Sequence, residues 1–268
     1  MHPDDLLAPP PLLVERFSKR YEDTVAVESL SLRVEAGEIL GLVGPNGAGK
    51  TTTLRSIAGV LPVQQGRVLI AGHDIAREEA PAKRRLAWIP DDPQPFETLT
   101  VLEHLEFTAR LYRVKDWRAR ADELLERFEL GAKRDALGGE LSRGMRQKLA
   151  FAQAWLYAPA LVLMDEPLSG LDPRGIRAAR DAIQELAAAG SAVVLSSHLL
   201  ELIEALGHRL LILDRGRTLF LGTLAQAREE LAAGQGSSLE ELFFAATEER
   251  AHTARPLSED AREAGETP

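Results

Sequence analysis

Residues 44–51 read GPNGAGKT and fit the pattern G-x-x-x-x-G-K-[ST]. An apolar run over residues 38–43 precedes them, as expected for a buried parallel strand, and a helix is expected over about residues 50–59. In this context glycines let backbone N–H groups approach phosphate oxygens, and the start of the helix adds a favourable dipole. The segment therefore predicts a nucleoside triphosphate site. Its predicted binding residues are Gly44, Pro45, Asn46, Gly47, Ala48, Gly49, Lys50, Thr51 and Thr52.

Two side chains of this segment have expected chemical roles. The Lys50 ammonium would pair with the β- and γ-phosphates, and the Thr51 hydroxyl would bind Mg²⁺. The pattern alone does not distinguish kinases, GTPases and transport ATPases, so the class of enzyme depends on the rest of the chain.

A second motif, LVLMDE at residues 161–166, is an apolar strand that ends in two acids. Ligands of open α/β sheets bind at the carboxyl ends of the strands. Asp165 is therefore placed to hold Mg²⁺ through water, and Glu166 to polarise the attacking water as a general base. A strand followed by an ordinary acidic loop is the alternative interpretation of this dipeptide alone.

Strand and helix patterns alternate along most of the chain. Alternation of this kind favours an α/β fold with a mostly parallel sheet and helices on both of its faces. Strands are expected over residues 12–16, 25–34, 38–43, 67–70, 86–89, 161–165, 192–196, 210–213 and 218–221. Helices are expected over residues 50–59, 100–111, 117–130, 173–189 and 199–206, and from about residue 142.

The same patterns divide the chain into three parts. Residues 1–11 are expected as a flexible, proline-rich lead, and residues 12–225 as the main domain. Within that domain, residues about 92–157 form a helical block inserted into the sheet, and residues 100–103 have the spacing of a capping box. Residues 226–268 are expected as a helical extension with a disordered acidic tail.

Composition restricts the partners. The formal net charge of −9 argues against nucleic acid, which needs a basic surface, and provides no polybasic patch for anionic lipids. The absence of cysteine excludes disulfides and thiolate zinc sites and fits a reducing compartment. The most apolar stretch, residues 154–164, is about half the roughly 20 residues that a membrane helix needs. The first residues lack the features of a signal peptide, so we expect a cytoplasmic protein.

With further motifs in a fixed order, the chain resembles an ABC-type ATPase over roughly residues 12–225. A plain structural interpretation exists for each motif alone: Tyr21 could be a strand aromatic and His198 a polar surface or core residue. The motifs are Tyr21 as the adenine-stacking aromatic, Pro90-Asp91 at the Q-loop, LSRGM at residues 141–145 as the signature, SGLD at residues 169–172 as the D-loop, and His198 as the switch histidine.

The resemblance implies a fold and a mechanism. The fold would be a P-loop NTPase of ABC type, with a mostly parallel core sheet, an antiparallel β subdomain and an inserted helical subdomain. Two ATPase subunits, identical or paralogous, would face head to tail, so that Ser142 and the N–H of Gly144 bind the γ-phosphate held by the other subunit. Mg²⁺-dependent hydrolysis of ATP to ADP and phosphate, with Glu166, His198 and Lys50 as catalytic residues, would drive a separate transmembrane permease at the inner face of the membrane.

The chain departs from the family pattern at the signature and at the Q-loop. Arg143 stands where glycine is usual, Met145 where glutamine is common, and Asp91 where a glutamine ligand of Mg²⁺ is expected. Asp91 can take that ligand role because Mg²⁺ prefers hard oxygen ligands, but Asp92 and Gln94 are nearby rivals. Together with residues 196–198 (SSH) and 170–173 (GLDP), these variants resemble the ATPases of ABC-2-type exporters, whose cargo the sequence does not select.

Two other classes of function remain as alternatives. A soluble ABC-type ATPase could act as an assembly factor without transport. A P-loop kinase or GTPase would need neither the signature nor the segment at residues 169–172.

Overall fold

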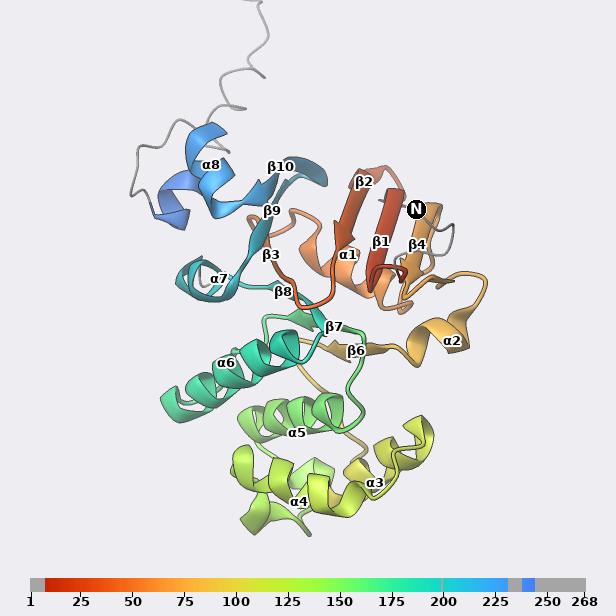
Figure 1. Ribbon diagram of the computed structural model, residues 1–268, viewed down its shortest axis with the longest axis vertical. Helices are drawn as coiled ribbons and strands as arrows, with labels where there is room; N and C mark the ends of the chain where they lie inside the picture. The colour runs from red at the N-terminus through yellow and green to blue at the C-terminus, as the bar shows by residue number, and fades with distance from the viewer. Residues whose placement is uncertain (1–7, 199, 231–237, 244–268) are drawn as a thin grey trace, which may run out of the picture.

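The computed structural model describes residues 8–198, 200–230 and 238–243 of the chain (Figure 1). Its centre is a six-stranded sheet in the order β10-β9-β3-β8-β7-β6, in which all neighbours are parallel except β9 and β10. The strands are β3 (Ile39–Val43), β6 (Leu86–Ile89), β7 (Leu161–Asp165), β8 (Ala192–Ser196), β9 (Arg209–Asp214) and β10 (Arg217–Thr223).

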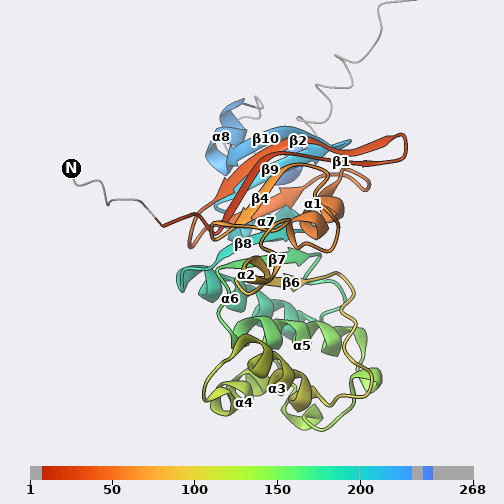
Figure 2. The same cartoon turned by 90° about the vertical axis from the view of Figure 1, so that its right-hand side faces the viewer.

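A second sheet is antiparallel and has the order β2-β1-β4-β5. Its strands are β1 (Leu12–Tyr21), β2 (Thr24–Val34), β4 (Gln65–Ile70) and β5 (His73–Asp74). Figure 2 shows this sheet toward one end of the molecule, beside β9 and β10, and the helices of the inserted block at the other end, with β8, β7 and β6 between them.

The central strands β3, β7 and β8 are buried along their whole length, so successive side chains enter two different cores. Leu161 and Leu163 pack with α1 (Lys50–Ile57) and with the antiparallel sheet. Val162 and Met164 pack with α5 (Arg143–Leu156) and α6 (Pro173–Ala188). The sheet therefore separates α1 from α5, and both figures show this arrangement. A strand with two buried faces reads as a continuous apolar run, which is why the sequence reveals it.

The helical block lies between β6 and β7. It contains α3 (Val101–Tyr112), α4 (Trp117–Arg127) and α5. Thr100 caps α3, and Glu103 bonds back to the N–H of Thr100, so the capping box that the sequence predicts is present. Phe151 and Trp155 of α5 pack against Phe128 at the end of α4.

The predicted fold class is confirmed, with small differences in the elements. β1 continues to Tyr21 because a bulge at Arg16, where φ is 47°, interrupts the alternation without ending the pairing with β2. The short helix α2 (Glu79–Lys83) and the two-residue strand β5 are too short to give a periodic signal. Two further α-helices are α7 (Leu200–Leu206) and α8 (Leu224–Glu230), residues 239–243 are also helical, and Gly131–Lys133 and Gly138–Glu140 form 3-10 turns.

Parts of the chain lie outside the described residues. The lead is described from residue 8 onward, and most of the predicted extension and tail, at 231–237 and 244–268, is not covered. Position 199, the predicted first residue of the helix now given as α7, is not covered either. The three-part division of the chain stays a prediction. Within the described residues, no helix is both long and apolar enough to cross a bilayer.

Candidate active site

The loop between β3 and α1 is shaped by its glycines. Gly49, the N-cap of α1, has φ of 105°, and a Cβ there would lie 2.4 Å from the carbonyl oxygen of Ala26 on β2. Gly47 has φ of 80° and open space around it, so its backbone conformation alone favours glycine. The loop is closed by a hydrogen bond from the N–H of Ala48 to the carbonyl of Pro45. This curved backbone leaves N–H groups available for an anion.

Lys50 places a cation inside that loop. Its Nζ donates to the carbonyl oxygens of Gly44 at 2.6 Å and Pro45 at 3.2 Å. Burial lowers the pKa of the Lys50 amine, and the carboxylates of Glu166 and Asp165 oppose this shift. The charges of both acids of the second motif thus act on this ammonium. A cation surrounded by loop backbone fits a phosphate chain, which is the ligand that the sequence predicts.

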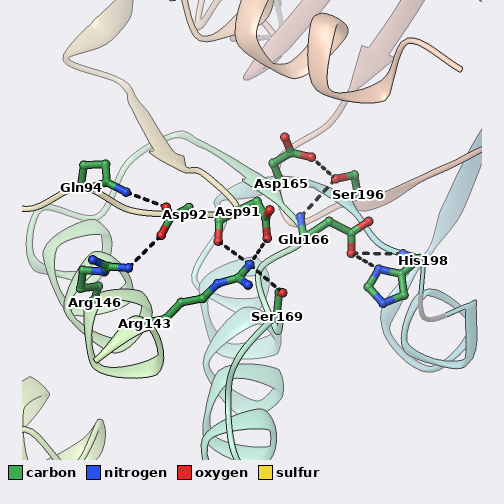
Figure 3. A network of polar contacts seen from close by, with 10 residues as sticks. All are labelled: Asp91, Asp92, Gln94, Arg143, Arg146, Asp165, Glu166, Ser169, Ser196 and His198. Atoms are coloured by element: carbon green, nitrogen blue, oxygen red, sulfur yellow. Dashed lines mark hydrogen bonds and ion pairs between the residues drawn. The ribbon is translucent and has the colours of Figure 1, made fainter. Parts of the chain in front are cut away.

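The two acids at the end of β7 are linked to the end of β8. Asp165 pairs in register with Ser196, and the Ser196 hydroxyl donates to Oδ1 of Asp165 at 2.6 Å in a buried contact (Figure 3). The N–H of Glu166 in turn donates to the carbonyl and the hydroxyl oxygen of Ser196, at 3.1 and 3.2 Å. Glu166 has φ of 48°, a left-handed conformation that turns the chain just after the strand. These bonds fix Asp165 and Glu166 relative to each other.

Glu166 also contacts His198. Nδ1 of His198 lies 2.7 Å from Oε2 of Glu166, so the ring donates there in the tautomer that carries its proton on Nδ1. The backbone N–H of His198 donates to the same oxygen at 3.2 Å. The His198 side chain is 69% exposed, whereas that of Glu166 is 21% exposed. The pair therefore combines a held carboxylate with an imidazole open to a ligand.

The residues fit Mg²⁺ as well as phosphate. Among the residues that the structure describes, no group of three or more histidine or acidic side chains could hold a metal by itself. Mg²⁺ usually keeps several waters and binds one or two carboxylates together with substrate phosphates. Thr51 at the start of α1 and Asp165 at the end of β7 suit this coordination. Their roles as ligands stay predictions.

The signature lies on the other side of the sheet from the phosphate loop. Ser142 is the N-cap of α5, and its hydroxyl accepts from the N–H of Met145 at 3.3 Å. A Cβ on Gly144 would lie 2.8 Å from the carbonyl oxygen of Gly170, so the close approach of these two segments requires glycine. The α5 start and the D-loop therefore form one packed unit.

Asp91 has a partner that the sequence does not indicate. Nη2 of Arg143 donates to Oδ1 of Asp91 at 2.7 Å (Figure 3). Arg146 pairs with Asp92 at 3.1 Å, and Nε2 of Gln94 donates to Asp92 at 2.6 Å. The two departures from the family pattern, Asp91 and Arg143, thus contact each other. The Mg²⁺ role of Asp91 stays a prediction.

Tyr21 ends β1 beside the turn into β2 and is 44% exposed. Nζ of the buried Lys19 lies 5.6 Å from the centre of its ring and donates to the carbonyl oxygen of Pro62. The ring has an open surface on which a base could stack, and its adenine-binding role stays a prediction.

Ser196 belongs to the candidate site, although the sequence does not indicate it as a site residue. It contacts Asp165 and Glu166 together, but serine at the end of a strand is common, and its value appears only when β8 lies beside β7. The feature of the sequence that could have indicated Ser196 is its position, two residues before His198, which was predicted as a site residue.

Comparison with known proteins points in one direction. The family model described as ABC transporter matches residues 27–169. A daunorubicin resistance ATP-binding protein of Streptomyces coeruleorubidus, DrrA3, is 36% identical over 82% of this chain and 70% of that protein. The Nod factor export ATP-binding protein I of Burkholderia pseudomallei is 36% identical over 79% of this chain and 70% of that protein. A solved structure of an ATP-binding subunit of an ABC transporter matches with a TM-score of 0.85 at 34% identity, over 88% of this chain and 99% of that one.

Lys50→Ala is expected to remove nearly all binding of MgATP, because Lys50 is the cation that the loop surrounds. Titration with a fluorescent ATP analogue measures the loss. Arg55→Ala is the matched control, since Arg55 is an exposed cation on the same helix. Near-normal affinity of Lys50→Ala would refute the assignment of the loop.

His198→Ala is expected to leave the affinity for ATP unchanged and to slow hydrolysis. The reason is that the hydrogen bonds of His198 go to Glu166, whereas the residues predicted to bind ATP lie in the phosphate loop. Affinity and turnover are measured separately on the purified variant. His73→Ala is the control, since it removes a partly exposed histidine that is likewise paired with a glutamate, Glu78. A loss of affinity with normal turnover per bound ATP would make His198 a structural residue.

Proposed function

The chain belongs to the ABC transporter family, and from this premise we propose that it is the ATPase subunit that powers a separate membrane-spanning exporter. Export is favoured by the relatives, one named for drug resistance and the other for Nod factor export. The cargo would be chosen by the permease, through which it passes. The subunit would work at the inner face of the cell membrane, held there by that permease.

The observation that supports this function most strongly is the continuous set of contacts from Asp165 through Ser196 and Glu166 to His198, beside the Lys50 ammonium. It brings a phosphate-binding cation, a candidate metal ligand and a candidate general base to one edge of the sheet. General bases must lie within hydrogen-bond reach of the water that they activate, and Glu166 is partly exposed at this edge.

The reaction follows from these positions. A water attacks the γ-phosphorus and gives a proton to Glu166, while the bond to the bridging oxygen breaks and ADP leaves with its electron pair. His198 orients the Glu166 carboxylate, and Lys50 offsets charge on the phosphates. Mg²⁺, when bound, would withdraw charge from the phosphate oxygens, with Thr51 and, through water, Asp165 holding it.

A second subunit completes the proposed site. Ser142 and Gly144 begin α5, where unpaired N–H groups favour an anion, but the sheet separates α5 from α1. A phosphate held at Lys50 would therefore meet these donors from another copy or a paralogue. The ATPase domain of this proposal spans residues 12–225, with the helical subdomain at about 92–157 and an extension at 226–268.

An apolar groove supports the proposed permease contact. It has a volume of about 380 Å³ and lies between the sheet and the helical block. Exposed apolar clusters of this kind mark contact sites for other proteins. We assign it to a cytoplasmic segment of the permease. Of the six large apolar side chains that are exposed in the described part of the chain, four line this groove: Val60, Phe96, Phe107 and Leu111.

Glu166→Gln is expected to bind MgATP but to hydrolyse it about 10² to 10⁴ times more slowly, as is typical when a general base is removed. With hydrolysis stalled, the ATP-bound dimer should accumulate, and light scattering should show a doubled mass in MgATP. Glu185→Gln is the control, since Glu185 pairs with Arg127 away from the site. A monomeric Glu166→Gln variant with normal turnover would contradict the role of Glu166.

Leu111→Glu is expected to prevent co-purification with the permease from solubilised membranes, because it places a charge in the groove. Leu137→Glu should co-purify normally, since Leu137 is also an exposed leucine of the helical block but does not line the groove. Thermal unfolding checks that both variants fold. Equal recovery of the two variants would place the permease contact elsewhere.

A further inference from the structure

Two consecutive aspartates of the loop after β6 pair with two arginines on one face of α5. Arg143 reaches Asp91, and Arg146 reaches Asp92. Positions three apart on a helix point the same way, so a single helix face receives both carboxylates. The charges match as well, with two negative groups on the loop and two positive groups on the helix.

Arg143 joins three segments rather than two. Its Nη2 donates to Oδ1 of Asp91 at 2.7 Å and to the hydroxyl oxygen of Ser169 at 2.9 Å. The N–H of Ser169 donates to the carbonyl of Glu166, which connects this serine to the catalytic segment. We call Asp91, Arg143 and Ser169 the Arg143 junction (Figure 3). A glycine at position 143 would have no side chain and could make none of the hydrogen bonds that Arg143 makes.

The loop at the junction is stiff and is bordered by the groove. Pro90, Pro93 and Pro95 restrict its backbone. Trp88 before the loop and Phe96 after it both line the groove. A segment bound in the groove would therefore contact both ends of a loop that cannot absorb the displacement by bending freely.

The ion pair between Arg143 and Asp91 is weak enough for a bound partner to shift it. The side chains of Arg143 and Asp91 are 46% and 50% exposed. Exposed ion pairs contribute little to stability, so a bound partner can shift them. A buried pair would instead resist displacement.

We propose that Arg143 is a positioning residue that connects the groove to the signature and to the catalytic segment. Displacement of the 90–95 loop reaches Ser142 and Gly144 through the Arg143–Asp91 pair, and reaches Glu166 through Ser169. In this arrangement the Asp91 carboxylate serves Arg143 rather than Mg²⁺. The inference rests on the ATPase function proposed above and adds to it the contacts that carry the coupling.

A double-mutant cycle on the full chain tests the junction. Asp91→Ala and Arg143→Ala should each lower turnover of MgATP about two- to five-fold, the range expected for an exposed pair. Because each residue acts through the other, the double variant should be no slower than the slower single variant. Arg134→Ala, which removes a similarly exposed arginine of the helical block paired with Asp122, is the control, and its effect should multiply with that of Asp91→Ala.

Three results would overturn the proposal. The first is multiplying effects of Asp91→Ala and Arg143→Ala. The second is normal turnover in both single variants. The third is a raised Mg²⁺ requirement in Asp91→Ala that Asp91→Gln corrects, which would make Asp91 a metal ligand instead. The same four proteins are also compared by their thermal unfolding midpoints, a measurement that needs no nucleotide. If the wild-type chain failed to bind ATP, the proposed function would be wrong, but the midpoints would still test the Arg143–Asp91 contact.

Discussion

The order of the parallel strands, with β8 between β3 and β7, is the constraint on which the active site depends. It brings the phosphate loop, which follows β3, to the same sheet edge as Asp165 and Ser196. The register is set because these strands bury both faces, and a slip of one residue would exchange the side chains of the two cores. Pairing of Asp165 with Ser196 in that register makes their 2.6 Å hydrogen bond possible. The geometry of the candidate active site is thus a consequence of core packing.

The same sheet keeps the phosphate loop and the signature apart within one chain. Helix α1 packs on one face and α5 on the other, so Lys50 and Ser142 belong to different layers. Gly144 packs against the carbonyl of Gly170, and a side chain there would push α5 away from the D-loop. The signature therefore has a structural reason for its glycine within one subunit, in addition to the proposed contact with a phosphate held by a second subunit.

Local signals in the sequence were enough for most of the fold and for the phosphate loop. The loop is a contiguous segment whose glycine and lysine positions act within a few residues, and the buried strands appear as unbroken apolar runs. The bulge at Arg16 hid the second half of β1, because the pairing continues where the alternation stops. Arg143 and Asp91 are 52 positions apart, and no periodic pattern connects a loop to the start of a distant helix. Ser196 was missed for the same reason, since its role requires a neighbouring strand.

Two kinds of polar contact occur at this sheet edge, one buried and one half exposed. The Ser196–Asp165 bond is buried, and an unsatisfied group there would cost the full desolvation penalty, so the Asp165 side chain is held in place. The Arg143–Asp91 pair is half exposed and stabilises the fold little. A chain that must keep its chemistry in place while responding to a partner needs both kinds. Contacts among residues 165, 166 and 196 hold the proposed reacting groups together, and the weak charged contact between 91 and 143 is the proposed route by which a displaced 90–95 loop acts on the signature and on Glu166.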